Sequence, residues 1–86
     1  MARYFFDFHD AQLSTRDHEG TECADRKAVS SEALRALCEI AAEHPERYTG
    51  GTLCVAVRDA TDRPVLTASI DLTAAWHVEE TRSEAA

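Results

Sequence analysis

The side chains most able to do chemistry lie close together near the N-terminus, at Asp7, His9 and Asp10. Asp7 and His9 are two residues apart, so in a strand both project from the same face. Carboxylates and imidazoles suit a Zn²⁺ ion or general acid/base catalysis. No further ligand follows at a spacing typical of a zinc site. The residues favour a solvated row of Asp7, His9 and Arg3, paired with Arg58, and we expect neither a metal nor a cofactor.

Two other groups of residues give weaker signals. Cys54 would act as a nucleophile with His9 as its base only if their strands were neighbours, and no oxyanion-hole signature accompanies them. The carboxylates from Asp17 to Asp25 resemble a calcium loop, but they lack its alternate-ligand order and its final bidentate Glu. We interpret that stretch as a solvated turn followed by a helix cap. These patterns predict a protein that is not an enzyme.

The composition is that of a small acidic globular chain. It has 86 residues, of which 44% are hydrophobic and 29% charged, with a net charge of −7. An acidic surface repels phosphate backbones and anionic membranes, so we expect no nucleic-acid partner and no membrane partner. The three cysteines form no CxxC pair, and the N-terminal apolar run is too short for a signal peptide. We therefore expect a cytoplasmic protein with reduced thiols.

Alternating apolar and polar side chains predict four strands. Aromatic side chains alternate with polar ones over residues 3–9, and a short returning strand is expected over 13–16. Alternation returns over 53–58 and 65–72. The loop between these two segments, 59–63, has the length of a hairpin connection, so we expect the last two strands to pair with each other.

One amphipathic helix is expected over residues 25–44. The Asp25 carboxylate suits a helix N-cap, and Pro45 ends the helix at or before the preceding residue. At 100° per residue, its apolar side chains fill one arc. That arc comprises Val29, Ala33, Leu34, Ala36, Leu37, Ile40 and Ala41.

Together these elements predict an α+β fold, a two-layer ββαββ domain with an antiparallel sheet and one helix packed on one face. We expect this domain over 1–76 and a disordered acidic tail over 77–86. The expected core comprises Tyr4, Phe6, Phe8, Leu34, Leu37, Ile40, Val55, Val57, Leu66, Ile70 and Leu72.

The sheet face away from the helix is the candidate interaction surface. A single helix covers one face, and a partly apolar open face is typical of an association surface. We expect apolar and charged side chains to intermix there, and the residues proposed for interaction are Arg3, Phe5, Asp7, His9, Cys54, Arg58 and Val65.

Several segments resemble a bacterial small-protein family known as a domain of unknown function, family 6894. They are Arg3-Tyr4-Phe5-Phe6-Asp7, His9-Asp10, Asp17-x-x-Gly20, Asp25, Glu32 to Leu37, Val57-Arg58-Asp59 and Arg63 to Leu66. Ala11 and Asp62 stand at turn positions where members often carry Gly. The resemblance spans roughly residues 3 to 72 and implies a stand-alone bacterial cytoplasmic domain. It implies no catalytic residues.

We interpret the chain as a non-enzymatic protein-interaction or regulatory module that self-associates as a homodimer, through either the outer sheet face or a free sheet edge. One alternative is a small metal- or ligand-binding enzyme that uses Asp7, His9 and Asp10. Another is an antitoxin-like regulator, because a strand pair followed by one amphipathic helix is similar to the opening of small antitoxins. Topology alone supports that likeness.

Overall fold

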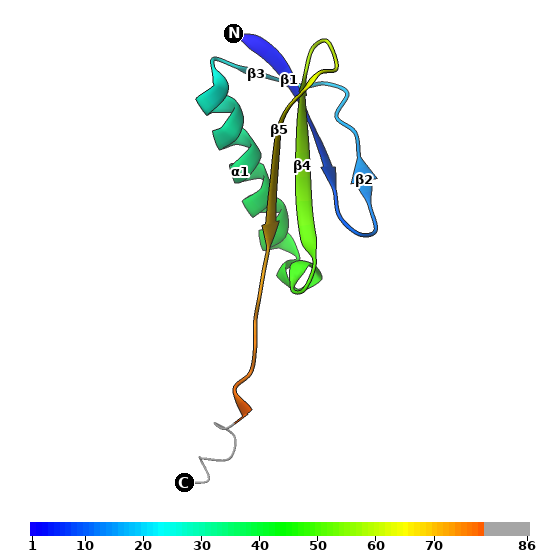
Figure 1. Cartoon of the computed structure of the whole chain (residues 1–86), viewed down its shortest axis with the longest axis vertical. Coiled ribbons are helices and arrows are strands. Elements are labelled where there is room, and N and C mark those ends of the chain that lie inside the picture. The colour runs from blue at the N-terminus through cyan, green and yellow to red at the C-terminus, as the bar shows by residue number, and fades with distance from the viewer. Residues whose placement is uncertain (79–86) are drawn as a thin grey trace.

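Alternation of apolar and polar side chains gives the long strands one apolar face each, and the strands pair antiparallel in a single sheet. The structure, a computed structural model, describes residues 1–78. Within these residues the sheet has five strands, and one long helix packs across one of its faces (Figure 1). The elements follow in the order β1 (Ala2–His9), β2 (Ser14–Thr15), β3 (Thr21–Cys23), α1 (Arg26–Glu43), the 3-10 turn η1 (Pro45–Tyr48), β4 (Thr52–Asp59) and β5 (Pro64–Asp71).

This arrangement confirms the α+β fold and the ββαββ order, with one addition. β3 is a short strand within the stretch that the sequence indicated as a turn or bulge. It pairs with β1 through Ala2↔Cys23, Arg3↔Glu22 and Tyr4↔Thr21. Three residues are too few to show a period of two, which explains why alternation did not reveal this strand.

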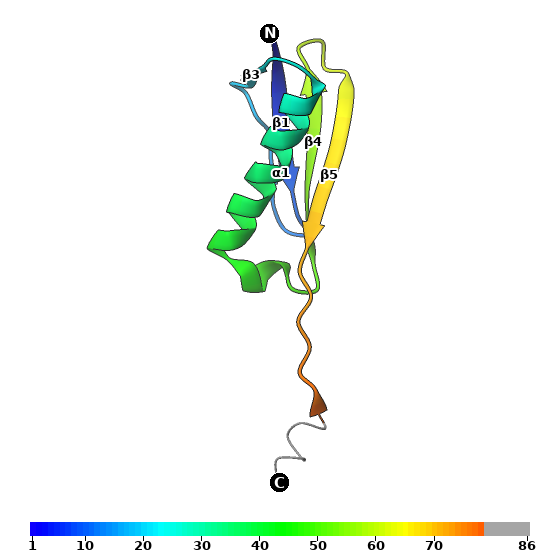
Figure 2. The same cartoon turned by 90° about the vertical axis from the view of Figure 1, so that its left-hand side faces the viewer.

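The strand order is β2-β1-β4-β5, with β3 also on β1. Because β4 occupies one edge of β1, both β2 and β3 lie along the other edge, end to end. β1 and β4 pair along their length, with Phe6 opposite Val57 and Phe8 opposite Val55. Leu53 in turn faces Ile70 across the β4–β5 hairpin. Among residues 1–78, β5 is therefore the last strand on its side of the sheet, as Figure 2 shows.

The helix begins and ends where the sequence predicted. The Asp25 Oδ1 atom accepts a hydrogen bond from the Ala28 N–H at 2.9 Å, which satisfies one of the unpaired donors of the first turn. Residues spaced by four contact the sheet: Val29, Ala33, Leu37 and Ala41 are buried. The expectation that Leu34 belongs to the core is wrong, because 51% of its surface is exposed. Leu34 lies at the margin of the apolar arc, beyond the narrow strip that touches the sheet.

The core between the helix and sheet contains residues that the prediction omitted. Tyr48 is 4% exposed, because η1 turns it back under the helix. Leu53 and Cys23 are buried as well. The remaining predicted core residues are buried or pack against the core while partly exposed: Tyr4, Phe6, Phe8, Leu37, Ile40, Val55, Val57, Leu66, Ile70 and Leu72.

The chain leaves the packed body of the molecule after Leu72. The Leu72 N–H donates to the Tyr48 carbonyl, and the Gly50 N–H donates to the Leu72 carbonyl, both at 3.2 Å. The following residues run on beyond β5 and away from the sheet (Figures 1 and 2). Trp76 on this extension is 96% exposed. The acidic tail expected over 77–86 lies, from residue 79 onward, outside the described residues. Through residue 78, no helix combines the length and the apolar character needed to cross a bilayer.

Candidate functional site

The most connected polar group of the sheet is Asp7 on β1 with Arg58 on β4. The Arg58 Nε atom lies 2.8 Å from Asp7 Oδ2, and Nη2 lies 3.3 Å from Oδ1, so the pair is bidentate. The Arg58 side chain is only 14% exposed. Its guanidinium carbon sits 4.7 Å from the centroid of the Phe5 ring, within range of a cation–π contact. Arg58 thereby covers Phe5 and balances Asp7 at the same time.

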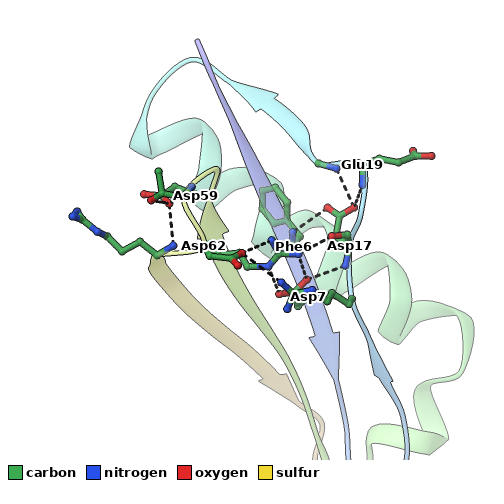
Figure 3. A network of polar contacts seen from close by, with 11 residues as sticks. Phe6, Asp7, Asp17, Glu19, Asp59 and Asp62 are labelled. Atoms are coloured by element: carbon green, nitrogen blue, oxygen red, sulfur yellow. Dashed lines mark hydrogen bonds and ion pairs between the residues drawn. The ribbon is translucent and has the colours of Figure 1, made fainter.

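Asp17 joins this pair to the edge of β1. Between β2 and β3 the edge of β1 has no strand beside it, and there the Asp17 Oδ2 atom accepts a hydrogen bond from the Phe6 N–H at 3.0 Å. The Asp17 Oδ1 atom accepts from the N–H groups of Glu19 and Gly20, both at 3.1 Å. In the other direction, the Asp17 N–H donates to Asp7 Oδ1 at 2.9 Å (Figure 3). The carboxylate takes the place of a neighbouring strand at the point where the edge is interrupted.

Gly20 lets this loop lie directly on the sheet. Its φ of +76° is in the left-handed region, and a Cβ atom there would come within 2.9 Å of the Phe5 ring and 2.8 Å of the Arg3 Cγ atom. The Arg3 guanidinium donates to the Glu19 carbonyl at 2.8 Å and forms an ion pair with Glu22 at 3.0 Å. Phe5 is consequently enclosed by Arg58 on one side and by the Gly20 loop on another. It is half-buried rather than open on the outer face.

At Asp7 and Asp17, hydrogen bonds lower the pKa by more than burial raises it. Burial raises the pKa of the Asp7 carboxyl, but the hydrogen bonds from Arg58 and from the Asp17 N–H outweigh it and lower that pKa below its ordinary value. Burial also raises the pKa of Asp17, and the N–H groups of Phe6, Gly20 and Glu19 outweigh it in the same way. Both carboxyls are therefore ionised hydrogen-bond acceptors near neutral pH, and neither is poised to act as a general base.

The β4–β5 turn extends the cluster. The Arg58 Nη1 atom donates to Asp62 Oδ1 at 2.9 Å, and Arg16 approaches the same oxygen at 3.4 Å. Asp62 has a φ of 69°, the left-handed conformation that Gly adopts most readily. This is one of the two turn positions where a Gly is often expected from the family resemblance. Here Asp62 adopts the left-handed conformation, and its carboxylate accepts a hydrogen bond from Arg58.

A second cluster forms around Asp10 at the opposite end of β1. Asp10 Oδ1 accepts from the N–H groups of Gln12 and Leu13, both at 2.8 Å. Asp10 Oδ2 accepts from the Tyr48 hydroxyl at 3.2 Å and lies 3.3 Å from the Arg47 guanidinium. The two backbone bonds, followed by the Tyr48 and Arg47 contacts, lower the pKa of Asp10. Asp10 therefore fixes the turn after β1 and anchors the buried ring of Tyr48.

The three residues of the enzyme alternative, Asp7, His9 and Asp10, do not converge. Asp7 is bound by Arg58, Asp10 is bound by Tyr48 and Arg47, and His9 projects to solvent between them. Among the residues through 78, no three His, Cys, Asp or Glu side chains form a group able to hold a metal ion. That the protein binds no zinc stays a prediction, which elemental analysis can test.

His9 and Cys54 do lie on neighbouring strands. They are directly opposite each other in the β1–β4 register, so their side chains share the outer face. No hydrogen bond joins the thiol to the imidazole in the described part of the chain, and Cys54 is half-buried. A nucleophile also needs an oriented base and a site for the oxyanion, and neither is assembled here.

Val65 occupies a different surface from the other candidate residues. It is 39% exposed and lines a groove of about 620 Å³ between the start of α1 and the start of β5. The β4–β5 register shifts between Val57 and Arg58, which pair with Leu66 and Pro64 and leave Val65 as the extra residue. Such a bulge re-aims a side chain, which accounts for the position of Val65 beside the helix.

Sequence reasoning missed Tyr48, Arg47 and the bridging role of Asp17. The order Asp17-x-x-Gly20 indicated a turn, and it gave no sign that the carboxylate would reach the edge of β1. Tyr48 follows closely after a helix-ending proline, which is the one local signal that its ring turns back toward the core.

Comparison with known proteins identifies a family and nothing more specific. No curated protein and no solved structure gives a significant match to this chain. A family model described as "Domain of unknown function (DUF6894)" matches residues 3–71. That range extends from β1 to the end of β5 and includes Asp7, Asp10, Asp17 and Arg58. The chain belongs to the DUF6894 family.

Proposed function

We propose that this domain is a non-enzymatic protein-interaction module that self-associates through the free edge of β5. The observation that carries the proposal is the outer backbone edge of this strand, which is unpaired within residues 1–78. β5 is eight residues long and is the last strand on its side of the sheet. An exposed strand of this length is a template for pairing with another chain. A two-fold dimer is the commonest way for identical chains to satisfy such an edge.

The backbone groups that face outward follow from the hydrogen bonds at the end of β5. Leu72 continues the strand, and both its N–H and its C=O are bonded toward Tyr48 and Gly50, on the β4 side. Because backbone direction alternates along a strand, the even-numbered residues of β5 face β4. The β1 strand leads to the same result. The Phe6 N–H points away from β4, so the odd-numbered residues of β1 bond to the even-numbered residues of β4. The odd-numbered residues of β4 then face β5, where their partners are even-numbered. The outward residues are Thr67, Ser69 and Asp71.

The two ends of β5 carry features that guard against pairing, whereas its middle does not. Pro64 and the irregularity beside Val65 lie at the start of the strand, and the charge of Asp71 lies at its end. Prolines, bulges and charges are the usual protections of an edge strand. Thr67 and Ser69, between them, are small, uncharged and exposed. These two residues form the part of the edge most ready to accept a partner strand.

The outer face supports self-association less well than the edge. Phe5 was the large apolar side chain expected there, and it is enclosed by Arg58 and the Gly20 loop. The enzyme alternative also loses support, because the carboxylates of Asp7 and Asp10 are engaged by arginines, a hydroxyl and backbone N–H groups. No contact in the described chain specifically favours the antitoxin-like alternative.

Amide hydrogen exchange tests the proposal within one molecule. The N–H groups of Thr67 and Ser69 face the free edge, and those of Ala68 and Ile70 face β4 and serve as matched controls. We expect the outward amides to become protected as protein concentration rises, while the control amides are protected throughout. Light scattering after size exclusion gives the mass in parallel. A monomeric mass at millimolar concentration, or outward amides that exchange fast in a dimer, would refute pairing at this edge.

A variant separates the edge from the rest of the fold. Ser69→Pro removes one outward N–H and leaves the β4 ladder intact, because proline is tolerated where the N–H faces solvent. Ser69→Ala keeps the N–H and is the control. We expect Ser69→Pro to be monomeric with an unchanged circular dichroism spectrum and Ser69→Ala to remain dimeric. Persistent dimerisation of a folded Ser69→Pro variant would move the interface elsewhere.

A further inference from the structure

We propose that each subunit of the self-associated form places Trp76 in its partner's groove between α1 and β5. This inference rests on the proposed pairing of β5 edges and names the contact that would make it specific. It begins from the extension beyond Leu72, where Trp76 projects into solvent with 96% of its surface exposed. Tryptophan is enriched at the centres of protein interfaces, where its large apolar ring fills a pocket.

The groove, which we name the α1–β5 groove, has a size and lining suited to an indole. Its volume is about 620 Å³. The apolar part of its lining comes from Tyr4, Val29, Pro64, Val65 and Leu66. Its rim carries three basic residues of this otherwise acidic chain, Arg26, Lys27 and Arg63. An apolar floor with a basic rim matches an aromatic side chain that is followed by acidic residues.

The chain itself contains such a segment. Trp76 is followed by His77 and Val78 and then by Glu79 and Glu80 in the sequence. The indole matches the floor of the groove, and the two glutamates match its rim in charge. The net charge of −7 opposes contact between two copies of this chain, and a local attraction of this kind would offset part of that repulsion.

Antiparallel pairing of two β5 strands brings these parts together. If Ile70 lies on the two-fold axis, each Trp76 lies opposite the partner's Pro64, beside the mouth of the groove. In this register Asp71 lies opposite Ser69. Placing Asp71 on the axis instead would set two like charges directly against each other, which is destabilising. The extension from Asp71 to Trp76 spans about 17 Å when extended, which is the length that this register requires.

The direction of the side chains agrees with this register. Even-numbered residues of β5 project toward the helix layer, as the packing of Leu66, Ile70 and Leu72 against the core shows. If the extension keeps the same alternation, Trp76 projects to that side too. Leu34 would add a second apolar contact, because it is 51% exposed. It lies four residues after Ser30 and seven after Lys27, so it shares the flank of α1 that lines the groove. A partner strand beside β5 would run along this flank.

Trp76 is the single tryptophan of the chain, so its fluorescence reports directly on the proposed contact. We expect a water-like emission maximum and strong quenching by iodide in dilute, monomeric protein. As the dimer forms, the maximum should move to shorter wavelength and quenching should fall at least threefold. Trp76→Ala should weaken dimerisation at least tenfold, whereas the control Thr73→Ala should change it less than twofold. Both positions are exposed, so both variants should fold.

The outcomes distinguish this inference from the proposed function. A dimer whose Trp76 stays quenchable, or whose affinity survives Trp76→Ala, overturns the inference and leaves edge pairing in place. A tryptophan that is shielded in a monomer, independent of concentration, would mean that the extension folds onto its own chain, and this also overturns the inference. A chain that is monomeric at every concentration ends both proposals.

Discussion

Replacing Asp17 by alanine removes the side chain that closes the interrupted edge of β1. Its carboxylate accepts from three backbone N–H groups, those of Phe6, Glu19 and Gly20. The Phe6 donor is part-buried, and leaving such a donor unpaired costs about 1–3 kcal/mol. The Glu19 donor is exposed and the Gly20 donor is part-buried, and each of these two turn bonds adds about 0.5 kcal/mol, at the low end for a hydrogen bond. We expect Asp17→Ala to lower the free energy of unfolding by about 2–4 kcal/mol.

A loss of this size is large for so small a domain. Total stabilities are typically about 5–15 kcal/mol, and 1 kcal/mol shifts the midpoint of a domain of this length by about 4–8 °C. Asp17→Ala should therefore melt roughly 10–30 °C below wild type. Asp17→Asn keeps a single acceptor oxygen. It can serve either the Phe6 N–H or the turn, but not both, so its loss should be intermediate.

Urea denaturation followed by circular dichroism measures these differences, with Glu19→Ala as the matched control. The Glu19 side chain belongs to the same loop and is exposed, and we expect a change within about 0.5 kcal/mol, the usual range for such surface positions. An Asp17→Ala loss no greater than that of the control would contradict the bridging role. A loss for Asp17→Asn equal to that for alanine would show that charge, rather than acceptor count, is what matters.

Three further predictions concern acid stability, the core and metal content. Because folding lowers the pKa values of Asp7 and Asp17, their ionised carboxylates stabilise the folded state fully above the ordinary aspartate pKa of about 3.9, and this stabilisation disappears as pH falls below it. In an acid titration, Asp17→Ala should therefore lose stability less steeply than wild type between about pH 4 and pH 2. Leu37→Ala should cost about 2–5 kcal/mol because Leu37 is 1% exposed, whereas Leu13→Ala, at 58% exposure, should cost less than about 0.5 kcal/mol in the same urea assay. Elemental analysis of untagged protein should find no stoichiometric zinc, and zinc that is lost in His9→Ala would revive the enzyme alternative.

The long elements of the fold were predictable because each repeats its pattern several times. The alternation of Tyr4, Phe6 and Phe8 was enough to indicate β1. Asp25 and Pro45 bracketed α1, which begins and ends within a residue of its predicted limits. β3 escaped prediction because it is short and follows a glycine. Leu34 was misassigned because an apolar arc gives the helix face but not how narrow a strip of it the sheet will cover.

The candidate site was predictable in its residue types and in the pairing of Arg58 with the row that contains Asp7. Asp7, Arg58 and Phe5 were expected to share the outer face of the sheet, and their partnership follows once β1 and β4 are known to be neighbours. The sequence contained no signal for that strand order. The Asp17 bridge depends on a gap between two short strands on the far edge of β1, and the Asp10–Tyr48 bond depends on the path of η1. These are long-range consequences of topology, which local patterns do not encode.

The unequal edges of the sheet also set a limit on growth. One margin is closed by β2, the Asp17 loop and β3, so within the described chain only β5 offers a continuous run of unpaired backbone. A building block with one such margin has a valence of one: once two copies join, neither has a site left for a third. Sheets that are open on both sides can instead elongate without end, as fibrils do. The Asp17 carboxylate, which occupies the β1 edge between β2 and β3, would then prevent the sheet from growing on that side. Its loss in Asp17→Ala should favour elongated aggregates over discrete dimers.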